Sequence, residues 1–375
     1  MLTSRPRECE PFAAHSRQWK QQRVTAQPST ARDPLEALHV PGWQHRHSGH
    51  CESGVAANLL THHGLPLTEP MAFGLSSSLI FAHFPFIRIG GQPLTAYRAL
   101  PGHVLRQLER RLSVRLGRRR FRDPDKAREA LDTALSQGTP VGIQASVFWL
   151  PYFPPEMRFH FNAHNLVVVG RDTDGSYRVS DPVFETPQRC DGASLEQARF
   201  VRGAFAPRGL MYWVESVERS RPVAQAIPAA IRTTIRLHGQ APVPWVGLRA
   251  VRLLARRIRQ LPQRRPDIGG QRLYVGQIIR MQEEIGTGGG GFRFMYASFL
   301  QEAAEHLQDE GLERIAGRMI EVGDRWRDFA LSAAHFCQDR HGASLTDVAA
   351  RLEQCADAEA AAVDELKQWA RRSGR

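Results

Sequence analysis

A cysteine stands in this chain where a loop gives way to an apolar helical segment. Cys51 follows the sequence His-Ser-Gly-His and is continued by the helical pattern of residues 52–64. A thiol in the first turn of a helix lies near unpaired backbone N–H groups and the positive end of the helix dipole, and both favour the thiolate. The same N–H groups can face the oxyanion that forms on an attacked carbonyl. Cys51 is therefore the candidate nucleophile.

A base and a group to orient it follow further along the chain. His164 begins the apolar segment 164–172, and Asp181 lies in the next segment, 177–184, after a Thr-Asp-Gly-Ser turn. An Asp-Gly turn between two apolar segments predicts a β-hairpin. With the turn centred there, position 164 faces position 184 or 185, and strand twist or a bulge at Pro182 brings the Asp181 carboxylate to the ring. Cysteine, histidine and aspartate in this order are typical of the papain-like arrangement, with His164 as base and Asp181 as orienter.

Two parts of this site stay open at the level of sequence. Papain-like enzymes carry an oxyanion-binding glutamine six residues before the nucleophile, but position 45 is a histidine here. The candidates for that role are Gln44, His45, His47 or backbone groups alone. Should Asp181 not orient the imidazole, the alternatives are Asn162, Asn165 and Asp172.

The histidines before Cys51 admit a second chemistry. His45, His47 and His50 precede Cys51 in the spacing H-x-H-x-x-H-C, which offers nitrogen and sulfur ligands for Zn²⁺. No matching pair of carboxylates or thiolates stands elsewhere at ligand spacing. We therefore favour the catalytic interpretation and expect no metal.

The order of elements predicts the domains that position these residues. Helical patterns cover 52–64, 103–112 and 123–138, and strand patterns cover 140–150, 164–172, 177–184 and 209–218. Helical patterns then run to the end of the chain. We expect an α+β, papain-like catalytic domain over 37–218, an all-helical domain over 219–375 and a flexible leader over 1–36.

Composition narrows the class of protein. The 375 residues include 50 Lys and Arg against 38 Asp and Glu, which gives a net charge of +12 and predicts an acidic partner. The five cysteines are widely spaced and odd in number, which argues against a disulfide framework. No apolar run reaches the roughly 18 residues of a membrane span. We expect a cytoplasmic protein.

Several segments resemble those of the butirosin biosynthesis protein H family. They are G-H-C-E-S-G-V-A-A-N-L-L (49–60), E-P-M-A-F-G-L-S-S-S-L (69–79), His164 and Ser-Asp-Pro (180–182). The helical second half, with glycines before Phe-Arg, is similar to the C-terminal domain of that family, so the likeness covers nearly the whole chain from about residue 40. The resemblance implies transfer of an acyl group from an acyl carrier protein thioester to an amine or hydroxyl. It implies no bound cofactor, since 4′-phosphopantetheine arrives on the carrier.

The expected function is therefore a cysteine-dependent acyltransferase of a biosynthetic pathway, acting through acyl-Cys51 on a small-molecule or lipid acceptor. A papain-like peptidase, amidase or thioesterase has the same triad and is the first alternative. A non-catalytic binding protein of such a pathway is the second.

A glycine-rich segment, 286–291, interrupts the helical half. It lacks the Gly-Lys-Ser/Thr ending of a phosphate-binding loop, so we do not expect nucleotide binding. One interpretation is a plain helix connection. In the other, the segment leans over the thiol, and substrate contacts the candidates Glu284, Gly288, Gly289 and Arg293.

An arginine-rich amphipathic segment, 249–265, is the expected docking surface for an acidic carrier. The candidate docking residues are Arg249, Arg252, Arg256 and Arg259. An ordinary solvated helix face is the plainer interpretation, and a membrane surface is a further partner if the acyl chain is fatty. Nucleic acid is not expected, because aromatic residues are not interleaved with the basic ones.

Overall fold

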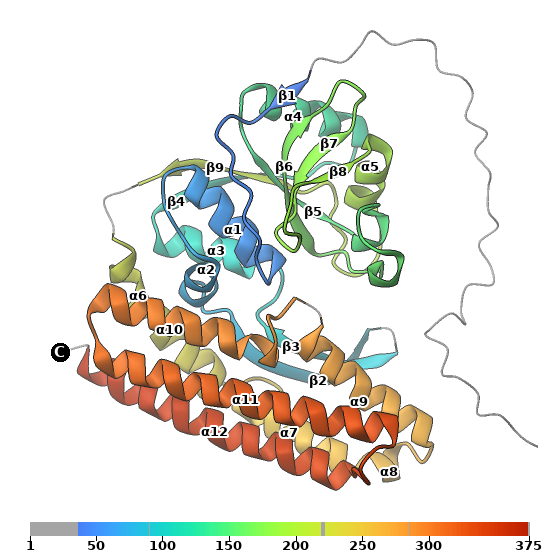
Figure 1. The fold of residues 1–375 in the computed structure, drawn as a ribbon, viewed down its shortest axis with the longest axis vertical. Coiled ribbons are helices and arrows are strands. Elements are labelled where there is room, and N and C mark those ends of the chain that lie inside the picture. The colour runs from blue at the N-terminus through green and yellow to red at the C-terminus, as the bar shows by residue number, and fades with distance from the viewer. Residues whose placement is uncertain (1–36, 90, 219–221, 285, 374–375) are drawn as a thin grey trace, which may run out of the picture.

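The computed structural model describes residues 37–89, 91–218, 222–284 and 286–373. The leader predicted over 1–36 lies outside the described residues. The chain mixes helix and sheet, as expected. An antiparallel sheet with its helices forms the upper half in Figure 1, and the helices of the C-terminal region form the lower half. No helix of the described residues is long and apolar enough to cross a membrane.

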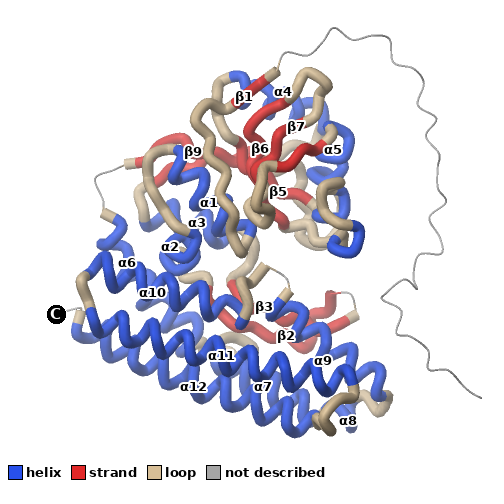
Figure 2. Tube along the Cα trace, viewed as in Figure 1, coloured by secondary structure: helices blue, strands red, loops and turns tan. Residues whose placement is uncertain are grey.

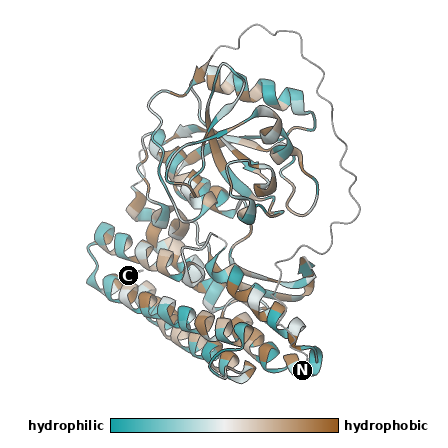
Figure 3. Cartoon of the chain, turned by 45° about the vertical axis from the view of Figure 1, so that its right-hand side comes forward, coloured by the Kyte–Doolittle hydropathy of each residue, from teal (hydrophilic) through white to brown (hydrophobic). Residues whose placement is uncertain are grey.

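The main sheet is antiparallel, with strand order β4-β9-β5-β6-β7-β8, and β1 pairs with the end of β6. Its strands are β1 (Leu38–His39), β4 (Val114–Arg119), β5 (Val141–Ala145), β6 (His164–Arg171), β7 (Tyr177–Ser180), β8 (Gln188–Cys190) and β9 (Met211–Val217). The central strands are apolar on both faces, and they are coloured as hydrophobic in Figure 3. Such strands are buried between helices on two sides.

The predicted hairpin forms between β6 and β7, with a register that differs slightly from the expected one. Val167 lies opposite Ser180, and a register shift separates the Val168 pair from the Gly170 pair. This irregularity lies on β6 and not at Pro182, where a bulge was one of the two expected ways to bring Asp181 to His164. β7 ends at Ser180, just before Asp181.

Five helices belong to the sheet half: α1 (Cys51–His62), α2 (Glu69–Leu75), α3 (His103–Arg111), α4 (Pro124–Ser136) and α5 (Gly192–Phe200). Asp123 caps α4 through the backbone N–H groups of Asp125 and Lys126, as the Asp-Pro start predicts. Gly64 lies just past α1 with φ +82°, a left-handed conformation that ends a helix readily only at glycine.

One hairpin leaves the sheet half and lies among the helices of the other half (Figure 2). It consists of β2 (Leu79–Ile89) and β3 (Gln92–Arg98). The His83 N–H donates to Trp245 O, and the Gly247 N–H donates to Phe81 O, so the C-terminal chain extends this small sheet. The sequence patterns did not predict the hairpin.

The C-terminal region is helical, as expected. Its elements are α6 (Val223–Thr234), a π-helical turn (Ile235–Gly239), α7 (Leu248–Arg259), α8 (Leu261–Arg264), α9 (Ile268–Glu283), a 3₁₀ turn (Gly290–Phe292), α10 (Arg293–Leu307), α11 (Glu310–Gln338) and α12 (Leu345–Arg372). Helices α10, α11 and α12 pack side by side, and α7 lies against α12 and β2.

A buried ionic cluster holds this region together. The Arg293 guanidinium donates to both carboxylate oxygens of Glu359, at 2.9 and 3.1 Å, and all of these groups are shielded from solvent. His238 Nε2 lies 3.0 Å from the same carboxylate, and Trp326 Nε1 donates to it at 3.3 Å. Burial raises the pKa of Glu359, but the Arg293 and His238 charges outweigh it and lower the pKa to about 2.

Candidate functional site

Cys51 is the first residue of α1, and its side chain is buried. His50 caps the helix from the preceding position. A free thiol thus stands at a helix N-terminus, where backbone N–H groups point past it. This is the placement expected from the sequence.

His164 begins β6, and its ring contacts both other members of the predicted triad. Its Nε2 lies 2.7 Å from Asp181 Oδ2. Cys51 is also close enough to this ring to contribute to the raised pKa of His164. The structure therefore brings together three residues that are far apart in the sequence.

Asp181 sets the charge of the imidazole. Burial by itself lowers the pKa of His164, but the Asp181 charge, the Asp181 hydrogen bond and the contact with Cys51 together outweigh it. Their combined effect raises the pKa of His164 to about 10. At neutral pH the ring is an imidazolium held between a carboxylate and a thiol, a state that stabilises the negative charge of a thiolate.

Two aromatic residues that the sequence did not single out complete this arrangement. The Tyr152 hydroxyl donates to Asp181 Oδ2 at 2.9 Å, on the same oxygen that faces His164. The Phe153 ring meets the His164 ring edge to face at 5.5 Å. Both lie in the connection between β5 and β6. Their only signal in the sequence is the aromatic run before His164, which does not say which ring reaches the carboxylate.

The alternative orienters are engaged elsewhere. Asn162 donates to Ala204 O, and Asn165 accepts from the Tyr212 hydroxyl at 2.9 Å. Asp172 pairs with Arg178 and Arg189. Asp181 is thus the acid that the structure places at His164.

The three side chains proposed for the oxyanion lie in different settings. His45 is held by Ser180 Oγ at 2.8 Å and Phe184 O at 2.9 Å, so both of its ring nitrogens have structural partners. Gln44 and His47 are exposed. The backbone N–H groups at the start of α1 are the donors that lie nearest in sequence to the thiol.

The zinc alternative finds no support in the geometry. His45 faces the end of β7, His47 faces solvent, and His50 is buried against α1. Within the described ranges, no three His, Cys, Asp or Glu side chains gather as metal ligands would.

The glycine-rich segment lies against the loop that leads into Cys51. A Cβ added to Gly49 would lie 3.7 Å from Gly288 Cα, and one added to Gly286 would lie 3.9 Å from His50 Cδ2. The segment therefore approaches the residues just before the nucleophile, as one of the two interpretations holds.

The polar residues predicted to face the acceptor from this segment are placed differently. Arg293 is fully buried and bound to Glu359, which corrects the expectation that it contacts substrate. Glu284 is exposed and pairs with Arg280. Its neighbour Glu283 instead supports the segment by accepting from the Gly290 N–H at 3.2 Å. Gly289 lies close to Arg327, since an added Cβ would meet its Nη2 at 3.0 Å.

A polar network on the other side of the nucleophile was also missed. Glu69 accepts from the Gly49 N–H at 2.8 Å, from the His50 N–H at 2.7 Å and from Ser53 Oγ at 3.1 Å. It holds the backbone before Cys51 in place. The segment 69–79 carries part of the family likeness, but nothing in its composition indicates this contact.

The predicted docking arginines lie on α7 and are partly neutralised by α12. Arg252 pairs with Asp357 at 2.8 Å, and Arg259 pairs with Glu353 at 2.7 Å. Arg249 donates to Pro242 O, and Arg256 is exposed. Two of the four charges are thus shared with acids of the same protein.

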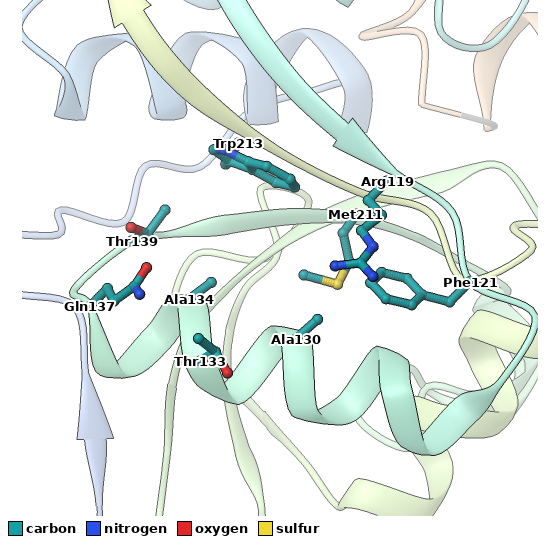
Figure 4. Close-up of a pocket in the computed structure, with 9 residues that line it drawn as sticks. All are labelled: Arg119, Phe121, Ala130, Thr133, Ala134, Gln137, Thr139, Met211 and Trp213. Carbon is teal, nitrogen blue, oxygen red and sulfur yellow. The ribbon is translucent and has the colours of Figure 1, made fainter.

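A groove of about 390 Å³ lies between α4 and the sheet, away from the predicted triad (Figure 4). Met211 and Trp213 of β9 line it, whereas Tyr212 between them points to the other face and bonds Asn165. Because neighbouring strand residues face opposite ways, the groove lies on the face of the sheet away from Tyr212. None of Cys51, His164 and Asp181 lines it.

Two family models match this chain, and the second along the chain begins within the sheet half, in α5. Residues 193–366 match a domain of unknown function, DUF4872. No curated protein matches the chain. Residues 50–182, which contain the cysteine, the histidine and the aspartate, match the family described as butirosin biosynthesis protein H, N-terminal. This match supports a butirosin biosynthesis protein H-like family for the region that holds the three residues, and it implies a protein of a biosynthetic pathway.

Proposed function

We propose that this chain is a cysteine-dependent acyltransferase with a papain-like catalytic half. Cys51 accepts an acyl group from an acyl carrier protein thioester and passes it to an amine or hydroxyl of a small-molecule or lipid acceptor. The observation that carries the proposal is the His164 imidazole, buried between the Cys51 thiol and the Asp181 carboxylate. The family likeness supports a biosynthetic role over a digestive one.

In the first half of the reaction, the Cys51 thiolate attacks the carbonyl carbon of the thioester. A carbon–sulfur bond to Cys51 forms, and the bond to the phosphopantetheine sulfur breaks. The leaving thiolate takes the proton from the His164 imidazolium. One thioester replaces another, so little driving force is required.

In the second half, the acceptor attacks acyl-Cys51. His164 is now neutral and takes the proton from the attacking nitrogen or oxygen, while Asp181 stabilises the imidazolium that forms. The bond to the Cys51 sulfur breaks and restores the thiolate–imidazolium pair. Tyr152 keeps the carboxylate in position throughout.

Transfer without hydrolysis requires a shielded acyl group. Cys51 and His164 are each less than a tenth exposed, and the glycine-rich segment of the helical half lies against the loop before Cys51. This burial supports transfer over a thioesterase or an open-cleft peptidase.

Intact-protein mass measurement with a panel of acyl carrier thioesters tests the proposal. The wild-type protein should gain the mass of the acyl group, and the Cys51→Ala variant should gain none while it keeps its far-ultraviolet circular dichroism. A peptidase ignores the carriers, and a non-catalytic protein binds them without a mass change. Acylation that survives in Cys51→Ala would place the nucleophile elsewhere and end the proposal.

A further inference from the structure

The outer end of the β2–β3 hairpin exposes large apolar side chains. Phe86 is 64% exposed, Ile87 42% and Ile89 45%. Phe86 is the most exposed large apolar side chain in the part of the chain that the structure describes. The hairpin ends at the margin of the helical half, beside α9 (Figure 1). Three such side chains within four consecutive residues form a contiguous apolar tip, and an exposed apolar group of this kind marks an interaction site.

The base of the hairpin is fixed to the rest of the molecule. The Phe86 ring meets the Trp245 ring edge to face at 5.4 Å. His83, in the same strand, lies 3.0 Å from Thr95 Oγ1 through Nδ1 and 3.2 Å from the Tyr274 hydroxyl through Nε2. Tyr274 belongs to α9, so the strand is anchored on the helical half. The apolar side chains of the tip stay exposed although the strand behind them is held in place.

Four arginines surround the base of this tip. Burial raises the pKa of Tyr274 to about 12, and four positive charges oppose this effect, so they lie near its ring. They are Arg257 of α7, Arg264 of α8, Arg265 just after α8, and Arg88 of the tip itself. The Arg265 guanidinium also lies over the Tyr274 ring, 5.9 Å from its centroid.

These charges are not neutralised by acids of the same protein. Arg88 donates to a backbone carbonyl of its own hairpin at 3.0 Å, and Arg264 donates to the Gln260 side chain at 3.2 and 3.3 Å. Within the described ranges, none of the four arginines forms an ion pair with a carboxylate. Asp267 is the acid nearest to them in sequence, and it caps α9 by accepting from the Gly270 N–H. The surface thus combines exposed apolar groups with uncompensated positive charge.

This combination favours one kind of partner over others. A second copy of the chain would bring its own four arginines to the same place, so charge repulsion disfavours a symmetric pair through this surface. An acidic protein would complement the charge, but a protruding apolar tip also requires a matching pocket on a protein partner. The interface of an anionic membrane accepts both, since its acyl chains receive apolar side chains and its headgroups bind arginines.

We propose that this surface binds the protein to an anionic membrane. Phe86, Ile87 and Ile89 enter the interface between headgroups and acyl chains, and the four arginines contact the headgroups. The inference goes beyond the proposed function, because it holds whether or not Cys51 is acylated.

Sedimentation of the full-length protein with vesicles tests the proposal. One set of vesicles contains phosphatidylcholine alone, and the other contains equal parts of phosphatidylcholine and phosphatidylserine. At low ionic strength the wild-type protein should bind the anionic set at least about tenfold more tightly. This preference should shrink as added salt shortens the Debye length below about 10 Å.

Phe86→Ser tests the apolar part of the surface. It removes the most exposed apolar group of the tip and should weaken binding to the anionic vesicles by about fivefold or more. The matched control is Leu100→Ser, because Leu100 is 61% exposed but lies beyond the opposite end of β3. This control should bind as wild type does, and far-ultraviolet circular dichroism checks that both variants are folded.

Arg88→Gln with Arg264→Gln tests the charged part. Both residues are exposed, and binding to the anionic vesicles should weaken by about 30-fold, the combined effect of two arginines at an anionic surface. The matched control, Arg115→Gln with Arg122→Gln, removes the same charge from exposed positions near the edge strand β4 and should have little effect.

Equal binding of the wild-type protein to the two vesicle sets would overturn the inference, as would unchanged binding in Phe86→Ser or in the arginine pair. Equal losses in the controls would also overturn it, since they indicate attraction by net charge alone. If the variants of the tip bind vesicles normally but lose affinity for purified acyl carrier protein, the surface docks a protein and the inference is wrong. Loading of Cys51 by a pantetheine thioester should be the same in all these variants, so a failure of the proposed function is seen separately.

Discussion

The His164 ring lies between two ionisable side chains, bound to Asp181 through Nε2 and close enough to Cys51 for the thiol to raise its pKa. The consequence is an ion pair between His164 and Asp181 that exists before any substrate arrives.

Asp181→Asn tests the pair through activity and stability together. Turnover should fall by about 10²- to 10⁴-fold, because the imidazole loses its orienter and the partner of its charge. The free energy of unfolding should also fall, by a few kcal/mol as an order of magnitude, since each pKa unit corresponds to about 1.4 kcal/mol.

The stability loss in Asp181→Asn should depend on pH in a defined direction. The pKa of His164 is raised from 6.5 to about 10 in the folded state, so its protonated form contributes fully below pH 6.5. That contribution disappears as the pH rises from 6.5 towards 10. Urea titrations at several pH values measure the gap between wild type and variant. A gap that is constant over this range would contradict the assigned ion pair, and Asp125→Asn on the surface serves as the unaffected control.

Sequence patterns could predict the residues of the triad but not their neighbours. Cys51 and His164 have local signals, a helix start and a strand start, and Asp181 follows from the hairpin turn. Tyr152, Glu69 and the placement of His50 have no such signal, because their roles depend on contacts between segments far apart in the chain. Arg293 was misplaced for the same reason: its charge pairs with Glu359, 66 residues away.

At the scale of elements, helix α12 carries two acids, Glu359 and Glu353, whose different surroundings allow a direct comparison. Glu359 is fully buried with Arg293, whereas Glu353 pairs with Arg259 on the surface. Removal of one partner of a buried pair leaves an uncompensated charge inside the protein, at a cost of about 3–5 kcal/mol. An exposed pair contributes at most about 1 kcal/mol.

Glu359→Gln should therefore destabilise the protein strongly, and Glu353→Gln should have a small effect. Chemical denaturation at neutral pH measures both, because the pKa of Glu359, lowered to about 2, keeps the acid ionised there. Similar losses in the two variants would show that the buried cluster does not stabilise the helices.

The elements themselves were predictable to different degrees. The caps of α4 and the turn between β6 and β7 follow from Asp, Pro and Gly at fixed positions. The strands β2 and β3 were not predicted as a hairpin, because Pro85 and Pro93 interrupt the alternation and the pairing continues with Trp245, 162 residues after its partner His83. Local patterns carry no information on such a partner.

At the scale of the whole molecule, the excess positive charge is unevenly compensated. Acids of α12 neutralise Arg252 and Arg259, and no ion pair of Arg249 or Arg256 is found in the described part of the chain. Docking of an acidic carrier on this helix stays a prediction, and the structure directs its test to the latter two residues.

Reversal of these charges, Arg249→Glu with Arg256→Glu, should raise the Michaelis constant for a carrier-bound donor by about tenfold at low ionic strength. The effect should fade as the Debye length falls below about 10 Å. Activity with a small pantetheine thioester, which has no acidic surface, should stay the same. The matched control reverses Arg115 and Arg122 near the edge strand β4. If that control impairs the carrier reaction and the α7 variant does not, docking occurs at the edge of the sheet instead.

The β2–β3 hairpin joins the two halves of the molecule, and this connection also limits how the two halves can be recombined. Its residues are encoded between those of α2 and α3, yet its partners are Trp245, Val246 and Gly247 and the helices behind them. A gene fragment cut near residue 218 would separate the hairpin from the chain that pairs with it. Recombination that exchanged the helical half alone would meet a foreign hairpin, so natural variants of the two halves should have been inherited together.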